Sequence, residues 1–372
     1  MSQTNTNKDY YVVIMAGGRG ERFWPVSREA TPKQLISILG DRSFLQEAVD
    51  RVLPVVPAEN TFIITNVAQV DEVRRQLPEL PAGNIIAEPC GRDTCAAVAL
   101  GAALVGQSNP NGVMAVLPAD HVIPDPERFQ QVLSDTLSYA SHGNHIVTIG
   151  INPNEPATGY GYIHCGNPVD TSGLKTAFFE GRRFVEKPDL ATAEKYLSSG
   201  EYRWNAGMFI WSYATILGAL DAHQPEMADL CRKWAGADSL AGMIAMLDTD
   251  YPPITKISVD FAIMEKVDNV VVADGAFTWD DLGAWTALAR HIAPDAQGNS
   301  AKADFVHVDS SNNIIFDNRS AERKTPISLV GIHDCIVVQT NDATLVASKK
   351  ESQKIKDLVK MLAGNADYSH LT

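Results

Sequence analysis

The first half of the chain alternates between short, almost wholly apolar runs and longer segments of mixed polarity. The apolar runs are YVVIMA, TFIITN, NIIAEP, VMAVLPAD and HIVTIGI. Short apolar runs that are bounded by turn residues are typical of strands buried on both faces. The segments between them have the length of helices, so the order strand, helix, strand predicts a parallel sheet covered on both faces.

The best-marked helix start lies at Ser43. Gln46 follows three residues later, and such a pair forms a capping box that satisfies the first free amides of a helix. Further helices are expected over residues 67–77 and from near Asp93 and Pro126. Together these elements predict an α/β fold that is Rossmann-like, with a mixed, mainly parallel sheet and helices on both faces.

Residues 152–285 follow a less regular pattern. Helices are expected at residues 190–197 and 213–220, and FAIMEK at residues 261–266 is expected to be helical. Strands with loops are expected in GYGYIHCG, RRFVEKP, WNAGMFIW and FTWDDLGAW. This region is expected to complete the first domain.

The pattern changes after the turn-rich stretch PDAQGNS. A final helix is expected in SQKIKDLVKMLA, and before it come the β-like runs DFVHVDS, NNIIFD, ISLVGIHDCIVVQT and TLVASKK. Closely spaced strands with turn signals predict a small β-rich domain, and a β-solenoid gives the same pattern. The sequence therefore predicts two domains, residues 1–292 and residues 293–372.

The composition is that of an ordinary globular protein, with 45% hydrophobic and 20% charged residues among 372. The formal net charge of −14 argues against nucleic acid as a partner, because nucleic-acid-binding proteins present a basic face. An anionic small substrate remains open, but it would need a local group of Arg and Lys side chains and a bound cation.

The expected location and redox state follow from targeting, membrane-spanning and cysteine motifs that the sequence lacks. The N-terminal stretch MSQTNTNKDY is polar, and the longest apolar stretch, CAAVALGAALVG, is too short to cross a bilayer. The five cysteines are odd in number and form no Cys-x-x-Cys motif, which favours free thiols over zinc ligation. We expect a cytoplasmic protein with no membrane partner.

The segment MAGGRGERFWPVSREATPKQ, residues 15–34, follows the first expected strand, and we call it the glycine-rich segment. Ligands of open parallel sheets bind beyond the carboxyl ends of the strands, where this segment lies. Its glycines allow close backbone approach, and its amides can form a nest for an anion. The run is neither G-x-G-x-x-G, because Phe23 stands at the third glycine position, nor a P-loop, because no Gly-Lys-Ser/Thr follows.

The complete run GGRGERFWPVSR with PKQ resembles the signature of the sugar-1-phosphate nucleotidyltransferases, and its Phe-Trp-Pro and Pro-Lys-Gln resemble the mannose-1-phosphate guanylyltransferases. The resemblance implies the nucleotide-diphospho-sugar transferase type of fold with a β-helix-like C-terminal domain. It also implies that the backbone at Ala16, Gly17 and Gly18 faces the nucleoside. Arg19 would then hold the triphosphate, and Lys33 would neutralise charge at the reacting phosphates.

The stretch AEPCGRDTCAAVAL places the start of a helix after a strand. A helix N-terminus with Arg92 beside it can hold an anionic or polar group, although Asp93 or Thr94 can equally be a simple cap. The family carries E-P-x-G-R-N-T here, near the base, which implies Glu88, Gly91 and Arg92 as nucleotide-binding residues. Asp93 and Ala97 depart from the usual Asn and Pro of the family.

Two carboxylates are candidate magnesium ligands. Asp120 follows an apolar strand in VLPADHVI, where it could equally be a turn residue, and Asp281 lies in FTWDDLGAW beside Asp280. The family has L-P-x-D-H and W-x-D-x-G at these places, which implies Asp120 and Asp281 as ligands and leaves Asp280 on a variable position. Mg²⁺ prefers few carboxylates together with phosphate oxygens.

The remaining candidates lie around the sugar. A surface ion pair would explain Glu186 and Lys187 equally well, but the resemblance implies that Glu186 accepts hydrogen bonds from sugar hydroxyls and Lys187 holds the sugar phosphate. The other implied sugar contacts are Gly159, Tyr160 and Asn205. Ser258 and Asp260 also match the family, and their role, structural or sugar-contacting, stays open.

The implied reaction is transfer of GMP from GTP to mannose 1-phosphate, which gives GDP-mannose and pyrophosphate with Mg²⁺ as cofactor. The attacking phosphate is already an anion, so no general base is needed, and none of the usual nucleophile–base pairs is evident. Alternatives are another hexose 1-phosphate or another nucleotide, or a non-catalytic regulator that kept the fold. The length of the chain favours the monofunctional form over relatives with an added isomerase domain, and we expect a homodimer.

Overall fold

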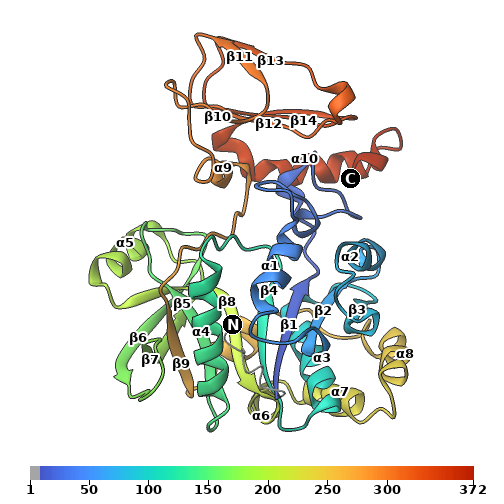
Figure 1. Ribbon diagram of the computed structural model, residues 1–372, viewed down its shortest axis with the longest axis vertical. Coiled ribbons are helices and arrows are strands. Elements are labelled where there is room, and N and C mark those ends of the chain that lie inside the picture. The colour runs from blue at the N-terminus through green and yellow to red at the C-terminus, as the bar shows by residue number, and fades with distance from the viewer. Residues whose placement is uncertain (1–8) are drawn as a thin grey trace, which may run out of the picture. The chain divides into compact units, whose positions relative to one another are not determined.

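The computed structural model describes residues 9–372. The chain folds into two compact units, and each is interrupted in sequence. The first unit comprises the chain up to Gly17 together with Gln46–Asp280, and the second comprises Gly18–Leu45 together with Asp281–Thr372 (Figure 1). Most of the glycine-rich segment therefore folds with the C-terminal part of the chain.

The first unit is built on a nine-stranded sheet with the order β3-β2-β1-β4-β8-β5-β9-β7-β6. Strands β1 to β4 are mutually parallel where they pair, β8 is antiparallel to both β4 and β5, and β5 is parallel to β9. The strands are β1 (Tyr10–Ala16), β2 (Thr61–Asn66), β3 (Ile85–Glu88), β4 (Val113–Pro118), β5 (Ile146–Ile151), β6 (Gly161–Val169), β7 (Phe178–Val185), β8 (Tyr202–Ser212) and β9 (Val270–Gly275).

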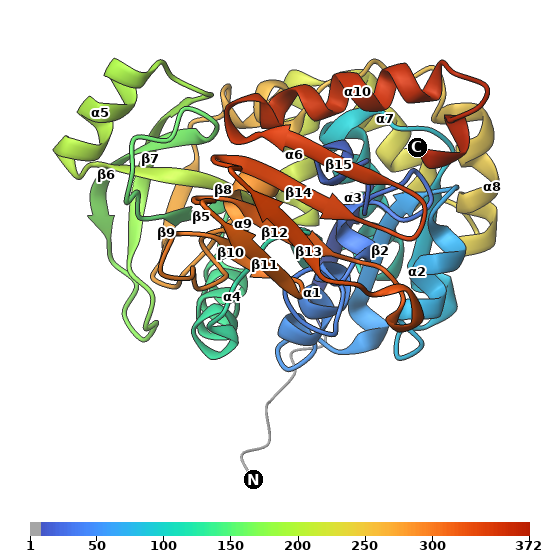
Figure 2. The same ribbon diagram turned by 90° about the horizontal axis from the view of Figure 1, so that it is seen from above.

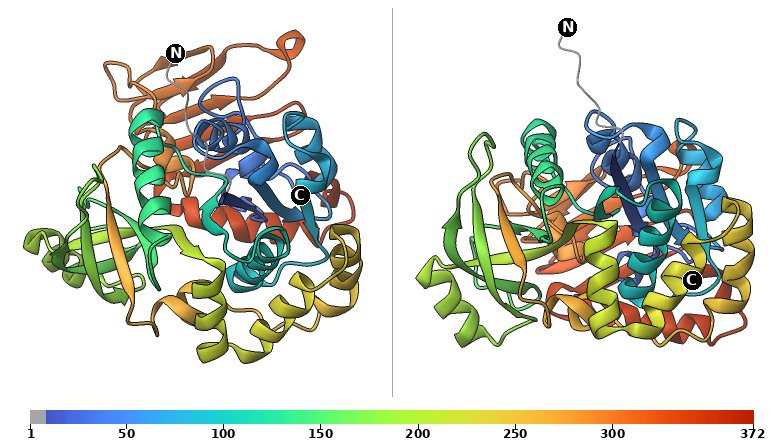
Figure 3. Two further views of the ribbon diagram at one scale, coloured as in Figure 1. Left: turned by 60° about the horizontal axis from the view of Figure 1, so that its bottom comes forward. Right: turned by 90° about the horizontal axis from the view of Figure 1, so that it is seen from below.

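Helices cover both faces of this sheet. Figures 2 and 3 show α3, α6 and α7 on one face and α4 on the other. The helices are α1 (Phe44–Val52), α2 (Val70–Gln76), α3 (Asp93–Ser108), α4 (Pro126–Ala140), α5 (Leu190–Ser199), α6 (Tyr213–His223), α7 (Pro225–Ala235) and α8 (Leu240–Asp250), with short turns η3 (Ala58–Asn60) and η4 (Ala82–Asn84) and a π-helical turn, η5 (Asp260–Met264). Helix α3 is apolar all round and is buried from Cys95 to Gly106, which is why its sequence shows no polar stripe.

In the second unit the chain follows a coiled path, and strands of successive turns pair in parallel. Strands β10 (Ser300–Lys302), β12 (Ile314–Asp317) and β14 (Cys335–Gln339) pair in parallel, and β15 (Thr344–Ser348) adds antiparallel to β14. Strands β11 (Phe305–Val308) and β13 (Ile327–Val330) form a second parallel pair. Buried Ile315, Ile327, Leu329 and Val337 fill the space within the coil. Successive parallel rungs around an apolar interior are the architecture of a β-helix.

The helices of the second unit come from both ends of the chain. They are η1 (Glu21–Phe23), η2 (Lys33–Leu35), α9 (Trp285–Leu288), η6 (Ala321–Arg323), η7 (Lys349–Lys354), α10 (Ile355–Ala363) and η8 (Ser369–Leu371). Figure 2 shows β14, β15 and α10 following one another across this unit. Within residues 9–372, none of the helices has both the length and the apolar character needed to cross a membrane.

The predicted fold class is confirmed. The main differences from the expected elements lie in residues 220–285. Strand β9 and helices α7 and α8 were not expected, FAIMEK forms part of a π-helical turn, and FTWDDLGAW is not a strand. The Trp residues of FTWDDLGAW face aromatic neighbours, and Leu282 has a φ of 42°, which lies outside the strand region.

Candidate functional site

The residues expected around the nucleoside, which we call the nucleoside end, lie in the first unit where β1 and β3 finish. Glu88 is the last residue of β3 and is only 6% exposed. A Cβ placed on Gly17 would lie 3.1 Å from Oε2 of Glu88, a tight contact that would require this carboxylate to shift. The phenol of Tyr251 donates a hydrogen bond to Oε1 of Glu88. The two predicted residues Gly17 and Glu88 are therefore neighbours.

Burial controls the charge of Glu88. Desolvation raises the pKa of this carboxyl to about 7, although the hydrogen bond from Tyr251 acts in the opposite direction. A carboxylate with one engaged oxygen keeps acceptor capacity on the other. Glu88 can thus accept hydrogen bonds from a ligand, and does so best in its ionised form.

The start of α3 differs from a simple capped helix. The side chain of Arg92 turns away from the helix axis and donates from Nε to the carbonyl of Pro252 at 2.9 Å. Asp93 has a φ of 65°, a left-handed conformation that Asn and Asp adopt more readily than other residues. Thr94 Oγ1 accepts a hydrogen bond from the amide of Val259 at 2.8 Å. The replacement of Asn by Asp at position 93 thus falls where either residue fits the backbone.

Asp120 follows the end of β4 by two residues and is half-buried. Next to it, His121 accepts a hydrogen bond on Nδ1 from Nε1 of Trp279 at 3.0 Å. The amide and the carbonyl of Val122 both pair with the backbone of Asp280, at 2.9 and 3.1 Å. The segment after β4 is therefore held to the segment that precedes Asp281.

Arg51 on α1 reaches the same segment from another side. Arg51 is 7% exposed, and its guanidinium donates to the carbonyl of His121 at 3.2 Å and lies over the ring of Phe129. Burial lowers the pKa of Arg51 to about 10, and the charges of Glu47 and Asp50 oppose this change. Arg51 therefore remains charged at neutral pH.

The donors around Asp120 suit a hard cation. Nδ1 of the neighbouring imidazole is engaged by Trp279, and no group of three or more His, Cys, Asp or Glu side chains arranged for a metal occurs in residues 9–372. A transition-metal cage is therefore not present in that range. A carboxylate at a strand end, which supplies only oxygen donors, fits Mg²⁺ bound jointly with phosphate oxygens.

Asp281 and Lys33 meet in the second unit. The ammonium of Lys33 donates to the backbone carbonyl of Asp281, and the amide of Gly283 donates to Oδ1 of Asp281 at 3.2 Å. Lys33 is 4% exposed, with its charge near the rings of Phe23 and Phe44. The structure thus places Lys33 as a support for the Asp281 turn, a contact that the sequence did not predict.

Arg19 and Gly18 belong to the exposed part of the glycine-rich segment. Arg19 lies 4.0 Å from Glu21, and its side chain is largely exposed. The carbonyl of Gly18 accepts a hydrogen bond from Nε2 of Gln34 at 2.9 Å. A Cβ on Gly20, whose φ is 60°, would lie 2.6 Å from the backbone nitrogen of Lys33, so this glycine is required for the turn.

The residues expected around the sugar, which we call the sugar end, gather in the first unit around the end of β7. Glu186 and Lys187 follow β7 directly and form an ion pair of 2.8 Å. A Cβ on Gly161 would lie 2.6 Å from Oε2 of Glu186 and 3.4 Å from Cβ of Asn205, which places these two side chains together. Lys187 has a φ of 46°, a strained value that is common at functional sites.

Asn205 is bonded to Asp260, whose role the sequence left open. Nδ2 of Asn205 donates to Oδ1 of Asp260 at 2.8 Å, and Oδ1 of Asn205 accepts from the amide of Gly207 at 3.0 Å. Burial raises the pKa of Asp260, the bond from Asn205 lowers it, and the charge of Glu186 raises it further. Asp260 therefore fixes the amide of Asn205 beside the Glu186 carboxylate.

Tyr160 connects the sugar end to the Asp120 segment. Its ring packs edge-on against Trp204, with centroids 5.0 Å apart, and against Trp279, with centroids 5.3 Å apart. Trp279 also contacts His121. Gly159 has open space where a Cβ would stand, and the same is true of Gly91 at the nucleoside end.

Sequence reasoning missed two supporting residues. Arg51 falls at the i+7 position from Phe44 and the i+3 position from Ala48, on the buried side of α1, so a cation in an apolar stripe was its available signal. Tyr251 follows the end of α8 and carries no comparable signal, because its contact with Glu88 joins distant parts of the chain.

Comparisons with known proteins agree with this arrangement. Residues 11–298 match the family model of nucleotidyl transferases, and residues 303–362 match that of the mannose-phosphate isomerase/GMP-like β-helix domain. The chain therefore belongs to the nucleotidyl transferase family of enzymes, and within it to the mannose-1-phosphate guanylyltransferases, as the following relatives show.

A mannose-1-phosphate guanylyltransferase of Escherichia coli K12 is 37% identical over 97% of this chain and 75% of its own length. The xanthan biosynthesis protein XanB of Xanthomonas campestris pv. campestris B100 is 36% identical over 95% of this chain and 73% of its own. The crystal structure of mannose-1-phosphate geranyltransferase from Thermus thermophilus superposes with a TM-score of 0.81 at 32% identity, covering 95% of this chain and 99% of that chain. The family resemblance inferred from the sequence is confirmed.

Proposed function

We propose that this protein transfers GMP from GTP to α-D-mannose 1-phosphate and releases pyrophosphate and GDP-mannose. The observation that carries the proposal is the identity of 37% with a mannose-1-phosphate guanylyltransferase over nearly the whole chain. The side chains that the reaction needs are all present, and those of the first unit cluster as a nucleoside end and a sugar end.

In the proposed reaction a phosphate oxygen of mannose 1-phosphate attacks the α-phosphorus of GTP. A new P–O bond forms, the bond to the bridging oxygen breaks, and its electron pair leaves with pyrophosphate. The nucleophile is an anion at neutral pH, so no side chain has to remove a proton. The main obstacle is repulsion between two polyanions, which positioned cations reduce.

For the residues we propose the roles that the family resemblance implies. Ionised Glu88 accepts hydrogen bonds from the N–H groups of guanine. The backbone of Ala16, Gly17 and Gly18 lies beside the base, and Gly91 and Arg92 border it. Arg19 binds the triphosphate, and Lys187 binds the sugar phosphate. The sugar hydroxyls meet Glu186, Asn205, Gly159 and Tyr160. Lys33 adds positive charge while it fixes the turn of Asp281.

Nucleotidyl transferases generally work with a divalent metal ion, and we propose Mg²⁺ here. Asp120 and Asp281 would hold it, and its charge would offset the phosphate charges during transfer. We further propose a cytoplasmic homodimer with a catalytic domain at residues 1–292 and a β-rich domain at residues 293–372. The uncharged outer face of β11 and β13, with exposed Val306, Val308 and Val330, suits a second copy of the same strand pair.

The metal assignment is tested with Asp120→Asn. Removing one charged ligand is expected to lower kcat about 100-fold or more and to weaken Mn²⁺ binding measured by electron paramagnetic resonance. Asp248→Asn on the exposed side of α8 is the matched control, and it should leave both quantities unchanged. Full turnover and unchanged Mn²⁺ binding in Asp120→Asn would contradict the assignment.

A further inference from the structure

The glycine-rich segment is anchored within the second unit by a buried hydrogen bond to the C-terminal tail. Nε1 of Trp24 donates to the carbonyl of Leu371 at 2.8 Å, across 347 positions of sequence. Trp24 and Leu371 are both buried. The carbonyl of Trp24 in turn accepts a hydrogen bond from Nε1 of Trp285 at 3.0 Å. Trp24 is therefore fixed through its side chain and through its backbone.

Aromatic packing extends this anchor into the β-helix. The ring of Trp285 lies 5.1 Å from that of Phe23 on one side and 5.1 Å from that of Phe316 in β12 on the other. All three residues are fully buried. Such a chain of packed rings is rigid, because each ring has few rotamers and contacts on both faces.

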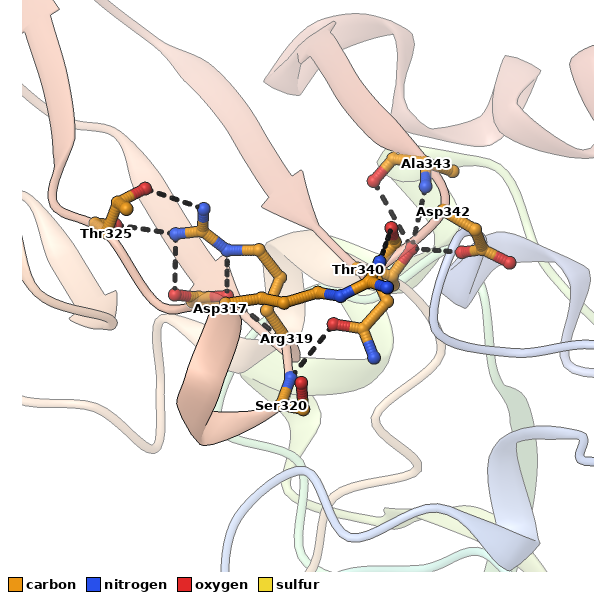
Figure 4. A network of polar contacts seen from close by, with 9 residues as sticks. Asp317, Arg319, Ser320, Thr325, Thr340, Asp342 and Ala343 are labelled. Atoms are coloured by element: carbon orange, nitrogen blue, oxygen red, sulfur yellow. Dashed lines mark hydrogen bonds and ion pairs between the residues drawn. The ribbon is translucent and has the colours of Figure 1, made fainter.

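A second anchor lies at the turn between β14 and β15. Nη2 of Arg28 donates to Oδ1 of Asp342 at 3.1 Å, and the guanidinium lies over the ring of Trp24. Figure 4 shows how Asp342 is placed: the hydroxyl of Thr340 donates to its Oδ1 at 2.6 Å and accepts from the amide of Ala343 at 3.1 Å. Burial alone would raise the pKa of Asp342, but the bonds from Thr340 and Arg28 bring it below its usual range.

The same turn is braced by neighbouring polar contacts. Figure 4 shows Arg319 bonded through two nitrogens to the carboxylate of Asp317, each at 2.9 Å, and to Thr325. The amide of Ser320 donates to Oδ1 of Asn341, the residue before Asp342, at 3.0 Å. The acceptor for Arg28 is thus part of an ordered network of bonds in the β-helix.

These anchors act on the catalytic end of the segment. Ser27, which precedes Arg28, donates from Oγ to the carbonyl of Gly20 at 2.8 Å. Gln34 donates to the carbonyl of Gly18, so both ends of the Gly18–Gly20 turn are tied within the segment, and the Gly20 end is tied to the residue next to Arg28. A displacement at Trp24 or Arg28 would therefore move the backbone that carries Arg19.

We propose that the β-helix holds the glycine-rich segment in its catalytic position, with Trp24 and Arg28 as positioning residues and Leu371 and Asp342 as their partners. The inference rests on the proposed guanylyl transfer, and it gives the C-terminal part of the chain a role in the reaction besides the proposed dimer contact. It predicts that substitutions far along the sequence from Arg19 lower turnover.

The first test is Trp24→Phe, which keeps an aromatic ring and removes the donor. A cavity of about 130 Å³ bordered by Trp24, Val359 and Lys360 already adjoins the ring, so the loosened segment has room to move without unfolding. We expect kcat to fall about tenfold or more while the KM for mannose 1-phosphate changes little. Trp211→Phe in the core of the first unit is the control, because Nε1 of Trp211 makes no hydrogen bond among the described residues.

The second test is Asp342→Asn, which keeps the shape of the side chain and removes its charge. Like Trp24→Phe, this variant should lower kcat. Asp357→Asn on the exposed side of α10 makes the same substitution in a surface ion pair with Lys360 and should leave kcat unchanged. Hydrogen exchange of residues 18–30 should be faster in Trp24→Phe and Asp342→Asn than in either control.

A double-mutant cycle decides whether Trp24 acts through Leu371. Deletion of residues 370–372 removes the acceptor, so the deletion and Trp24→Phe should reduce kcat by similar factors and together by little more than either alone. If the two factors multiplied in the combined variant, or if kcat were unchanged in Trp24→Phe, the proposal would be overturned. If the wild-type protein forms no GDP-mannose at all, the proposed function fails, and the exchange measurement still reports whether the segment is held.

Discussion

At the scale of single residues, Glu88 is a carboxyl group whose burial disfavours the charge that the proposed function requires. A carboxyl that is buried beside Gly17 is neutral more often than an exposed one, because its charged form is poorly solvated. Recognition of the N–H groups of guanine needs the ionised form, since the protonated carboxyl carries an O–H donor and only the ionised carboxylate is purely an acceptor. The pKa of about 7 places the change between the two forms at neutral pH.

This balance predicts a pH-dependent stability. The pKa of Glu88 in the folded protein lies above the ordinary 4.5, so the folded state binds the proton of Glu88 more tightly than the unfolded state does. The stabilisation that results is complete below pH 4.5 and is lost as pH rises through about 7. At about 1.36 kcal/mol per pKa unit the loss amounts to about 3 kcal/mol. Denaturant unfolding between pH 5 and 8 should show this slope in the wild type and in the exposed control Glu194→Gln, but not in Glu88→Gln.

The same substitution tests base recognition. Glu88→Gln should lower kcat/KM for GTP about 10- to 100-fold, which corresponds to the loss of a hydrogen bond to a charged group. In the wild type, kcat/KM for GTP should rise with pH through about 7. An unchanged kcat/KM in Glu88→Gln would remove Glu88 from the nucleoside end.

At the scale of elements, helix α1 supports the segment after β4. Arg51 is the link, because its buried guanidinium bonds the carbonyl of His121, next to Asp120. Arg51→Met should lower the free energy of unfolding by about 1–3 kcal/mol, since that carbonyl loses its partner. It should also raise the Mg²⁺ concentration for half-maximal activity, whereas Arg51→Lys should restore part of the loss.

The control for this prediction is Arg74→Met on exposed α2, where the arginine makes a surface pair with Asp71. Surface pairs contribute little to stability. An Arg51→Met protein with wild-type stability and wild-type Mg²⁺ dependence would show that α1 does not position the Asp120 segment.

The elements that the sequence predicted well are those whose pattern is local. Strands β1 to β5 are continuous apolar runs, and α3 is an apolar helix between two of them. The pattern failed where long-range contacts decide the conformation. FTWDDLGAW has the residues of a strand, but Trp279 is held by His121 and Tyr160, and Leu282 adopts a positive φ.

The candidate site shows the same division. Motif positions such as Glu88, Asp120 and Glu186 could be found because each lies at or just after the end of a predictable strand. The supporting residues Tyr251, Arg51 and Asp260, which bond Glu88, His121 and Asn205, come from segments that no local pattern links to those strands. Whether the predicted residues act as expected remains a prediction for the variants above.

At the scale of the whole molecule, the division into units changes how the glycine-rich segment is understood. Its sequence reads as one loop after β1, yet Ala16 and Gly17 belong to the first unit, while Gly18 to Gln34 belong to the second. The contact between Trp24 and Leu371 spans almost the full chain, so no pattern in the sequence could have shown it. The proposed positioning role of the β-helix follows from this contact.

The overall acidity of the chain also fits the account. A net charge of −14 opposes the binding of polyanions in general, so the proposed function assigns binding to local cations such as Arg19 and Lys187, together with a metal that acidic side chains would hold. In the proposed function, selectivity for one nucleotide and one sugar phosphate would depend on Glu88 at one end and on Glu186 with Asn205 at the other.

The central claim is tested most directly by initial rates of pyrophosphate release from the purified protein with Mg²⁺. Each of GTP, ATP, UTP, CTP and dTTP is paired in turn with mannose 1-phosphate and with glucose 1-phosphate, and the products are identified by mass spectrometry. The account predicts the highest kcat/KM for GTP with mannose 1-phosphate and GDP-mannose as the product. A clear preference for another pair, or no release of pyrophosphate with any pair, would contradict it.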